Sequence, residues 1–324
     1  MREPFQGELV SLQAVPSVRT LVDMGPHPLS ILRREFLART VEVLSPRAAV
    51  TVTGAASQVE AVEAMNGRKA GSVLVATETG ELEGIVTERD VLLRWQPGVA
   101  SHAGSVRALM SPNPQVLKSN ASIARLVHLM ASGGYRHVPI LDSDGAAPRM
   151  LSSKDFVDNI HRRLTSKLLD PNNAVTVAGN VVDLFFDATL DVLQPDPPLV
   201  INSTKRVADA LEMMRKRGRG AVVITDLNHH IIGIFTERDY LTKVVLEPRT
   251  PEEITIVEKM TGSPRTLQTS ASVAVGFGLL SEGGYRHLPL VSTEERLVGI
   301  LSVRNVLTYL SASIVSALGG PQSP

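Results

Sequence analysis

The sequence predicts a mixed α/β protein of the α+β type, built from four copies of one β-α-β-β-α unit. A tetrapeptide that joins a strand to a helix occurs four times: Thr87-Glu-Arg-Asp90, Ser152-Ser-Lys-Asp155, Thr236-Glu-Arg-Asp239 and Ser302-Val-Arg-Asn305. The first and third copies are identical and lie 149 residues apart, and within each half the two joints are 65 or 66 residues apart. Units this small cannot bury a sheet face alone, so they are expected to pack as two tandem pairs.

The residues before the third joint predict a β-hairpin that runs directly into a helix. Residues 221–225 and 231–235 are short apolar runs, and residues 226–230 between them form a polar turn. The tetrapeptide at residues 236–239 and the apolar residues after it have the pattern of a capped helix start. The same order of elements is expected at the other three joints.

The remaining elements keep this order along the chain. Around the first joint we expect a helix over 29–41, a strand over 49–52, a helix over 58–65 headed by Ser57, and strands over 72–76 and 82–86. Around the second we expect a short strand at 116–117, a helix capped by Ser122 and ending at 130, a strand over 133–141 and a helix over 156–164. A second lead-in helix is expected over 181–190.

These patterns divide the chain into seven segments. They are an N-terminal lead-in with a helix (1–39), repeats 1 and 2 (40–105 and 106–170), a linker helix (171–188), repeats 3 and 4 (189–255 and 256–312) and a C-terminal tail (313–324).

Composition excludes several classes of protein. The 324 residues are 43% hydrophobic and 20% charged, which allows packed cores and argues against disorder. Lys plus Arg equals Asp plus Glu, so no net field attracts nucleic acid or an anionic membrane. The absence of cysteine removes disulfides, thiolate zinc sites and cysteine nucleophiles. With no secretory signal at the start and no apolar run of ~18 residues, a soluble cytoplasmic protein is expected.

Each joint permits two interpretations. A Thr or Ser at a helix start leaves backbone N–H groups free for a phosphate, and an acid three residues later can accept two hydrogen bonds from a ribose diol. The same spacing also forms a capping box, in which the two side chains satisfy the amides of the helix itself. Recurrence of the joint beside basic strand starts and glycines favours a nucleotide site.

Those two further repeated features lie near the joints. The strand starts Gly134-Tyr-Arg-His-Val-Pro139 and Gly284-Tyr-Arg-His-Leu-Pro289 place cationic donors where they could neutralise phosphate, or could simply be solvated. Gly84, Gly233 and Gly299 precede three joints by three residues, which leaves room for a planar base or for a tight strand crossing. The basic run at residues 215–219 is expected to complement a helix dipole or to face solvent, and contact with a ligand phosphate is the less favoured alternative.

The four units resemble CBS domains, a family named after cystathionine β-synthase. The resemblance rests on the four joints and the two Gly-Tyr-Arg-His strand starts, and it covers about residues 40–312. It implies tandem pairs of repeats that bind adenosyl ligands. Two pairs in one chain are similar in architecture to the γ subunit of AMP-activated protein kinase, which implies a pseudo-symmetric disc, either as a monomer or as a homodimer.

The resemblance also implies which residues hold the ligand, because in such pairs the acid of one unit binds ribose and basic residues of its partner reach the phosphates. Two sites rank first: Thr87 and Asp90 with Arg136 and His137, and Thr236 and Asp239 with Arg286 and His287. Ser152 and Asp155 form a third, in which Arg149 replaces the glycine. Ser302 and Asn305 rank last, because an amide accepts a diol more weakly than a carboxylate does.

The expected function is that of a non-catalytic regulatory protein. It would sense AMP, ADP or ATP, the last accompanied by Mg²⁺, in clefts between paired repeats, and would signal to an unidentified protein partner. Two alternatives are a scaffold without a physiological ligand and a sensor of S-adenosylmethionine or a dinucleotide. An enzyme is a third hypothesis, against which no catalytic triad, phosphate-binding P-loop or metal cluster is found outside the repeats.

Overall fold

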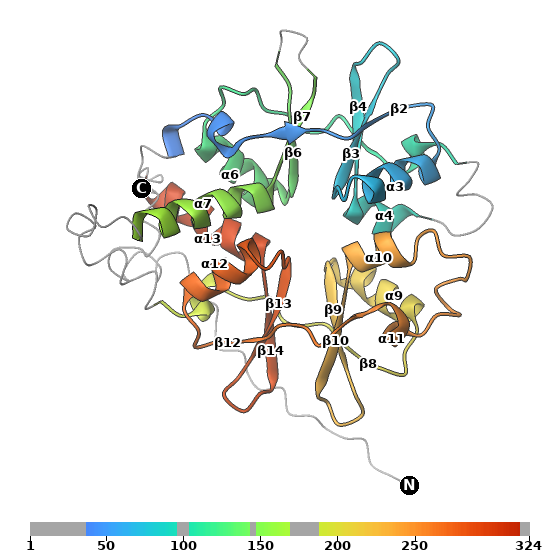
Figure 1. Ribbon diagram of the computed structural model, residues 1–324, viewed down its shortest axis with the longest axis vertical. Helices are drawn as coiled ribbons and strands as arrows, with labels where there is room; N and C mark the ends of the chain where they lie inside the picture. Colours follow the sequence, from blue (N-terminus) through green and yellow to red (C-terminus); the bar gives the residue numbers. More distant parts are fainter. Residues whose placement is uncertain (1–36, 96–103, 143–146, 169–187, 318–324) are drawn as a thin grey trace, which may run out of the picture.

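Four antiparallel β-hairpins form the frame of the structure. The computed structural model describes residues 37–95, 104–142, 147–168 and 188–317. The hairpins pair β3 (Ser72–Ala76) with β4 (Leu82–Thr87), β6 (His137–Ile140) with β7 (Arg149–Ser152), β9 (Ala221–Thr225) with β10 (Ile231–Thr236), and β13 (His287–Val291) with β14 (Leu297–Ser302). We call the repeats built on these hairpins units 1 to 4. They lie around a common centre in a disc viewed face-on in Figure 1.

Each unit has one helix before its hairpin and one after it. The helices before are α3 (Gln58–Gly67), α6 (Ile123–Gly133), α9 (Val207–Arg217) and α12 (Val273–Ser281). Those after are α4 (Glu88–Arg94), α7 (Ser153–Leu168), α10 (Glu237–Lys243) and α13 (Val303–Ala317). Short helical turns precede the units: η1 (Val41–Leu44), η2 (Val106–Ala108), η3 (Leu190–Leu193) and α11 (Ile256–Lys259). The predicted α+β class with its repeated units is confirmed.

Local sequence explains where these elements begin and end. Ser57 caps α3 through a capping box with Glu60, as expected. The strand expected from residue 133 starts only at His137, because α6 continues to Gly133 and Gly134 ends it with a φ of 67°. The strand expected at 116–117 is a single bridge from Leu117 to Ile140. The two lead-in helices expected over 29–41 and 181–190 lie mostly outside the described residues.

Exchanged edge strands join the two units of each pair. β1 (Arg47–Ala48) precedes unit 1 but pairs with β7 of unit 2, and β5 (Ser111–Pro112) precedes unit 2 but pairs with β4 of unit 1. In the second half, β11 (Thr261–Gly262) pairs with β10 of unit 3, while Asp196 bridges to Ile300 of unit 4. The parallel strands β2 (Thr51–Thr53), β8 (Val200–Asn202) and β12 (Leu267–Gln268) lie beside β3, β9 and β13. Residues 47–48, expected within repeat 1, therefore satisfy the free edge of unit 2.

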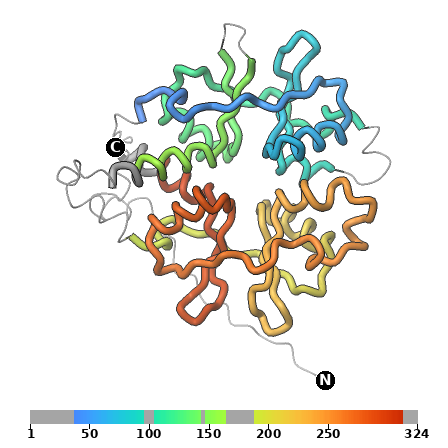
Figure 2. The backbone as a smooth tube through the Cα atoms, viewed as in Figure 1, coloured from blue at the N-terminus to red at the C-terminus, as the bar shows by residue number. Residues whose placement is uncertain are grey.

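Two apolar cores connect the two halves of the chain. One core unites units 2 and 4 and includes Phe156 and Phe277, and the other unites units 1 and 3 and includes Phe235 and Tyr240. In the first, α13 packs on α6 and α12 on α7; in the second, α10 packs on α4 (Figures 1 and 2). Strand exchange thus ties units within a pair, and helix packing ties the two pairs together.

Candidate functional site

All four joints form the hydrogen bonds of a helix cap. In unit 1, Oδ2 of Asp90 accepts hydrogen bonds from the backbone N–H of Thr87 (2.8 Å) and from its hydroxyl (2.5 Å). The other joints repeat this arrangement at donor–acceptor distances of 2.6–2.9 Å: Thr236–Asp239, Ser152–Asp155 and Ser302–Asn305. One oxygen of each side chain therefore stabilises its own helix start.

The second oxygen of the acids in units 1 and 3 ties the joint to the exchanged strand. Oδ1 of Asp90 accepts from Arg94 (2.6 Å) and from the hydroxyl of Ser111 on β5 (2.8 Å). The corresponding oxygen of Asp239 pairs with Lys243 (2.6 Å) and accepts from Thr261 on β11 (2.9 Å). In each case a hydroxyl from the neighbouring segment already occupies a position that a ribose hydroxyl could take.

The joints of units 2 and 4 differ from this pattern. Oδ1 of Asp155 pairs with Arg47 (2.9 Å), whose side chain is 75% exposed. The amide nitrogen of Asn305 instead donates to the backbone carbonyl of Gln194 (2.9 Å). The amide of Asn305 thus forms hydrogen bonds within the protein. Its joint was ranked last among the four predicted ligand sites.

The joints border two clefts, which contain eleven of the twelve predicted residues; Asn305 lines neither. Cleft 1, with a volume of about 460 Å³, contains the predicted set Thr87, Asp90, Arg136 and His137, together with Ser302. Cleft 2, about 1110 Å³, contains the predicted set Thr236, Asp239, Arg286 and His287, together with Ser152 and Asp155. Arg286 and both histidines border both clefts. The fold therefore brings each predicted set together.

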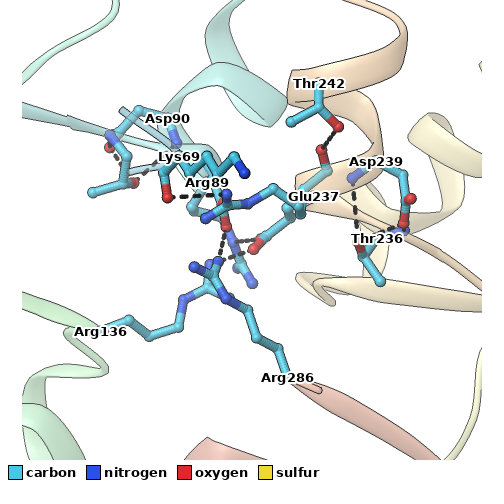
Figure 3. Close-up of polar contacts among 12 residues, drawn as sticks. Lys69, Arg89, Asp90, Arg136, Thr236, Glu237, Asp239, Thr242 and Arg286 are labelled. Carbon is cyan, nitrogen blue, oxygen red and sulfur yellow. Dashed lines mark hydrogen bonds and ion pairs between the residues drawn. The ribbon is translucent and has the colours of Figure 1, made fainter. Parts of the chain in front are cut away.

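A group of ion pairs, which we call the charged centre, adjoins both clefts. The carboxylates of Glu88 and Glu237 are its anions, and each side chain is 2% exposed. Glu237 pairs with Arg89 (2.5 Å) and Arg136 of the first pair of units, and Glu88 pairs with Arg238 and Arg286 of the second pair. Figure 3 shows Arg136 and Arg286 reaching the region of Glu237 from different units. Every ion pair in this centre crosses a boundary between units.

The charges of this centre shift one another's ionisation. Burial alone would raise the pKa of Glu237, but Arg136 and Arg89 outweigh it and lower the pKa to about 2. Burial alone would lower the pKa of Arg136, but Glu237 and Glu88 outweigh it and raise that pKa. Burial lowers the pKa of Arg286, which Glu88 offsets only in part. The pairing of Glu237 with Arg136 therefore favours the charged form of both side chains.

Two imidazoles complete the lining of the charged centre. Burial, together with nearby guanidinium groups, lowers the pKa of His137 well below its usual value and that of His287 to about 4. Both are consequently neutral near pH 7. A Cβ on Gly71 would lie 2.7 Å from Nε2 of His137, and one on Gly220 would lie 3.2 Å from Nε2 of His287. The absence of a side chain at these two glycines lets the imidazoles approach.

Glycines before the joints serve strand crossing. A Cβ on Gly84 would lie 2.6 Å from Sδ of Met110, and one on Gly233 would lie 2.2 Å from Sδ of Met260. A Cβ on Gly299 would lie 3.2 Å from Cβ of Pro195. Each space is thus filled by the segment that crosses the strand. Of the two interpretations given for these glycines, the structure supports the tight strand crossing.

Several functional candidates were missed from the sequence. Glu88 and Glu237 occupy the second position of the joint, where only the two identical copies have glutamate, and that restriction was the available signal. The third position is basic in all four joints: Arg89, Lys154, Arg238 and Arg304. Arg219 was not missed altogether, because contact of its basic run with ligand phosphate was the less favoured alternative; it lines cleft 1 and pairs with Asp196.

The fold and its clefts define a class of protein made from small α/β repeats intertwined in pairs. The chain belongs to the CBS domain family, whose model matches residues 41–95, 106–162, 191–246 and 252–312. The family resemblance inferred from the joints is confirmed. Proteins of this type are generally regulatory rather than catalytic. Within the described part of the chain, no helix is long and apolar enough to cross a membrane, and no three His, Asp or Glu side chains are grouped to hold a metal.

Curated relatives match over much of the chain. An uncharacterised 33.4 kDa protein of a ribosomal RNA operon in Thermofilum pendens is 29% identical over 206 residues, covering 64% of this chain and 66% of the relative. The CBS domain-containing protein CBSCBSPB1 of Arabidopsis thaliana is 25% identical over 325 residues, covering 93% and 58%. The chain spans about half to two thirds of the length of these curated relatives.

Solved structures share the arrangement of four repeats. Protein MJ1225 of Methanocaldococcus jannaschii, described as a candidate archaeal homologue of the γ subunit of AMP-activated protein kinase, matches with a TM-score of 0.69 and 17% identity. An uncharacterised conserved protein of Pyrococcus horikoshii matches with a TM-score of 0.53 and 18% identity. Each match covers 84% of this chain and 99% of the other. These likenesses show the fold.

Proposed function

We propose that the chain is a non-catalytic regulatory protein that binds AMP, ADP or ATP between its repeats and changes the surface it offers to a protein partner. One observation carries the proposal: each cleft unites a joint acid of one unit with an arginine of that unit's partner. In cleft 1 these are Asp90 of unit 1 and Arg136 of unit 2. In cleft 2 they are Asp239 of unit 3 and Arg286 of unit 4.

The chemistry of these groups matches the two ends of a nucleotide. A carboxylate oxygen such as Oδ1 of Asp90 can exchange the hydroxyl of Ser111 for a ribose hydroxyl at similar energy, because one hydrogen bond replaces another. A guanidinium binds phosphate through two parallel hydrogen bonds. Arg136 and Arg286 keep 27% and 29% of their side chains exposed, so a ligand in the clefts can reach them. Where ATP is the ligand, Mg²⁺ would enter with its phosphates.

The relatives support a regulatory role. The chain belongs to the CBS domain family, and the structural neighbour MJ1225 is named as a candidate homologue of the γ subunit of AMP-activated protein kinase. A nucleotide that touches two units would bridge them, and its binding energy would then favour one relative placement of the units over another. The partner that responds to this change would be a protein.

A scaffold without a ligand is the second candidate, because a specific observation favours it. Both oxygens of Asp90, Asp155 and Asp239 already accept hydrogen bonds or form ion pairs inside the protein. If capping were their whole role, replacing them would alter stability alone.

Thermal unfolding with AMP, ADP, ATP with Mg²⁺, and S-adenosylmethionine separates the two candidates. At a hundred times its dissociation constant, a ligand adds about 2.7 kcal/mol, which raises the unfolding temperature by roughly 5–10 °C. We expect an adenine nucleotide to produce this shift, and Asp90→Ala with Asp239→Ala to remove it. Asp209→Ala is the matched control, because Asp209 also accepts the cap hydrogen bond of a helix but lines neither cleft. If none of these ligands raises the unfolding temperature, the scaffold without a ligand is the remaining candidate.

A further inference from the structure

The charged centre connects each cleft to the joint of the other. Glu237 belongs to the joint whose residues Thr236, Arg238 and Asp239 line cleft 2. Its carboxylate nevertheless holds Arg89 and Arg136, and these two arginines line cleft 1. The joint of one cleft therefore anchors the cations of the opposite cleft.

The second glutamate repeats this connection in the other direction. Glu88 lies between Thr87 and Arg89 in the joint of cleft 1. Its carboxylate holds Arg238 and Arg286, both of which line cleft 2. The pseudo-symmetry of the two halves thus produces two reciprocal links rather than one.

A phosphate in either cleft has to compete with one of these glutamates. Arg89 and Arg136 are 32% and 27% exposed, whereas the carboxylate they share is 2% exposed. A ligand anion therefore reaches the guanidinium groups from the cleft side while Glu237 holds them from within. Drawing Arg136 toward a phosphate weakens its pair with Glu237, and that residue is covalently continuous with Thr236 and Asp239 of the other cleft. Such a chain of directly contacting groups can carry energetic coupling between two sites.

The sign of the coupling is set by charge. The centre holds four arginines and two glutamates, so its formal charge is +2 with both histidines neutral. A phosphate monoester brings about −1.5 to −2 charges near pH 7. The first ligand therefore cancels the excess positive charge, and a second ligand enters a centre that no longer attracts it.

We propose that Glu88 and Glu237 are positioning residues that couple the two clefts, so that a nucleoside phosphate bound in one cleft weakens binding in the other. The proposal rests on the proposed function, that is, on nucleotide binding in the clefts. It assigns a role to two residues that touch no ligand themselves and act through the arginines they hold.

Calorimetric titration with AMP tests the coupling. The single-cleft variants Asp90→Ala and Asp239→Ala each report the affinity of the cleft that remains. The unmodified protein should show two dissociation constants for AMP. The larger of the two should exceed the dissociation constant of each single-cleft variant by about fivefold or more, which is the lower end of the typical range for coupled sites. In Glu237→Gln, this excess should fall to about twofold or less, because the link from cleft 1 to the joint of cleft 2 is removed.

Two further variants make the test independent of folding and of net charge. Glu237→Gln combined with Arg89→Gln keeps the formal charge of the centre while it releases Arg136. The excess should again fall to about twofold or less, because only the reciprocal link through Glu88 remains. Glu83→Gln is the matched control, because Glu83 pairs with Arg107 on the surface of unit 1. It should preserve the coupling.

The possible outcomes separate this inference from the proposed function. Clefts that bind AMP independently in the unmodified protein, or coupling that survives both Glu237 variants, would overturn the inference and leave nucleotide binding intact. If the titrations detect no binding of AMP, ADP or ATP, the proposed function is overturned, and the inference is overturned with it.

Discussion

The joints of units 1 and 3 and those of units 2 and 4 share one hydrogen-bonded start but continue into different helices. In units 1 and 3 the second joint residue is a buried glutamate, and the helix is short: α4 and α10 each have 7 residues. In units 2 and 4 the second residue is Ser153 or Val303, and α7 and α13 extend over 16 and 15 residues. The longer helices carry apolar side chains such as Phe156 and Leu307 into the core between units.

The difference shows how one motif supports two kinds of contact. Between units 2 and 4 the helices meet through a large apolar core, of whose buried members only Val303 lines either cleft. Between units 1 and 3 the apolar core is joined by ion pairs whose arginines also face the clefts. We therefore expect perturbations of the charged centre to affect stability and ligand binding together, and perturbations of the other contact to affect stability alone.

The largest effect is expected from Glu88→Ala, which should lower the free energy of unfolding by about 3–5 kcal/mol. The change leaves Arg238 and Arg286 without their shared carboxylate in a half-buried setting. Denaturant unfolding measures the loss. Glu83→Ala, which breaks a surface pair with Arg107, should cost at most about 1 kcal/mol. Equal losses in the two variants would contradict the distinction between the charged centre and a surface ion pair.

Leu307→Ala should cost about 2–5 kcal/mol, because it opens a cavity where a side chain is 2% exposed. The measurement is again denaturant unfolding, together with nucleotide titration of the folded variant. Its nucleotide affinity should remain that of the unmodified protein, since Leu307 belongs to the apolar core between units 2 and 4 and lines neither cleft. If the folded Leu307→Ala variant showed a large change in nucleotide affinity, the apolar core between units 2 and 4 would also respond to ligand.

Stability should fall as the pH is lowered from about 6.5 towards 4. The folded protein lowers the pKa of His137 and His287, the latter to about 4, so the unfolded chain binds more protons within this window. Each histidine can contribute a slope of up to about 1.4 kcal/mol per pH unit. Unfolding free energies measured across the window should show a smaller slope in His287→Gln. His128→Gln, on an exposed position of α6, should keep the original slope. An unchanged slope in His287→Gln would exclude His287 as a source of the slope.

The smallest effect concerns the feature that all joints share. Thr87→Ala and Ser302→Ala each remove a hydroxyl from a helix cap and should cost about 1 kcal/mol. Thermal unfolding of the two variants side by side measures this. Similar losses are expected because capping is common to both kinds of joint, and a loss confined to one of them would show that the caps are not equivalent.

Sequence reasoning was most successful where the determining contacts lie within a few residues. The hairpin at 221–235, the caps at Ser57 and Ser122, and the repeated order of elements all depend on local pattern. It also grouped Thr87 and Asp90 with Arg136 and His137 correctly in space, but only through the family resemblance. No periodicity in the chain connects residues so far apart.

The sequence by itself determined the repeat, the class of fold and the starts of helices such as those capped by Ser57 and Ser122, because backbone hydrogen bonds and caps depend on neighbouring residues. Only the tertiary structure decided that β1 completes the sheet of unit 2, that Met110 fills the space beside Gly84, and that Glu237 holds arginines from the opposite pair. These contacts join segments tens to more than a hundred residues apart. They depend on which strand edges and which charges meet when the four units pack around one centre. The local sequence pattern does not specify these long-range contacts.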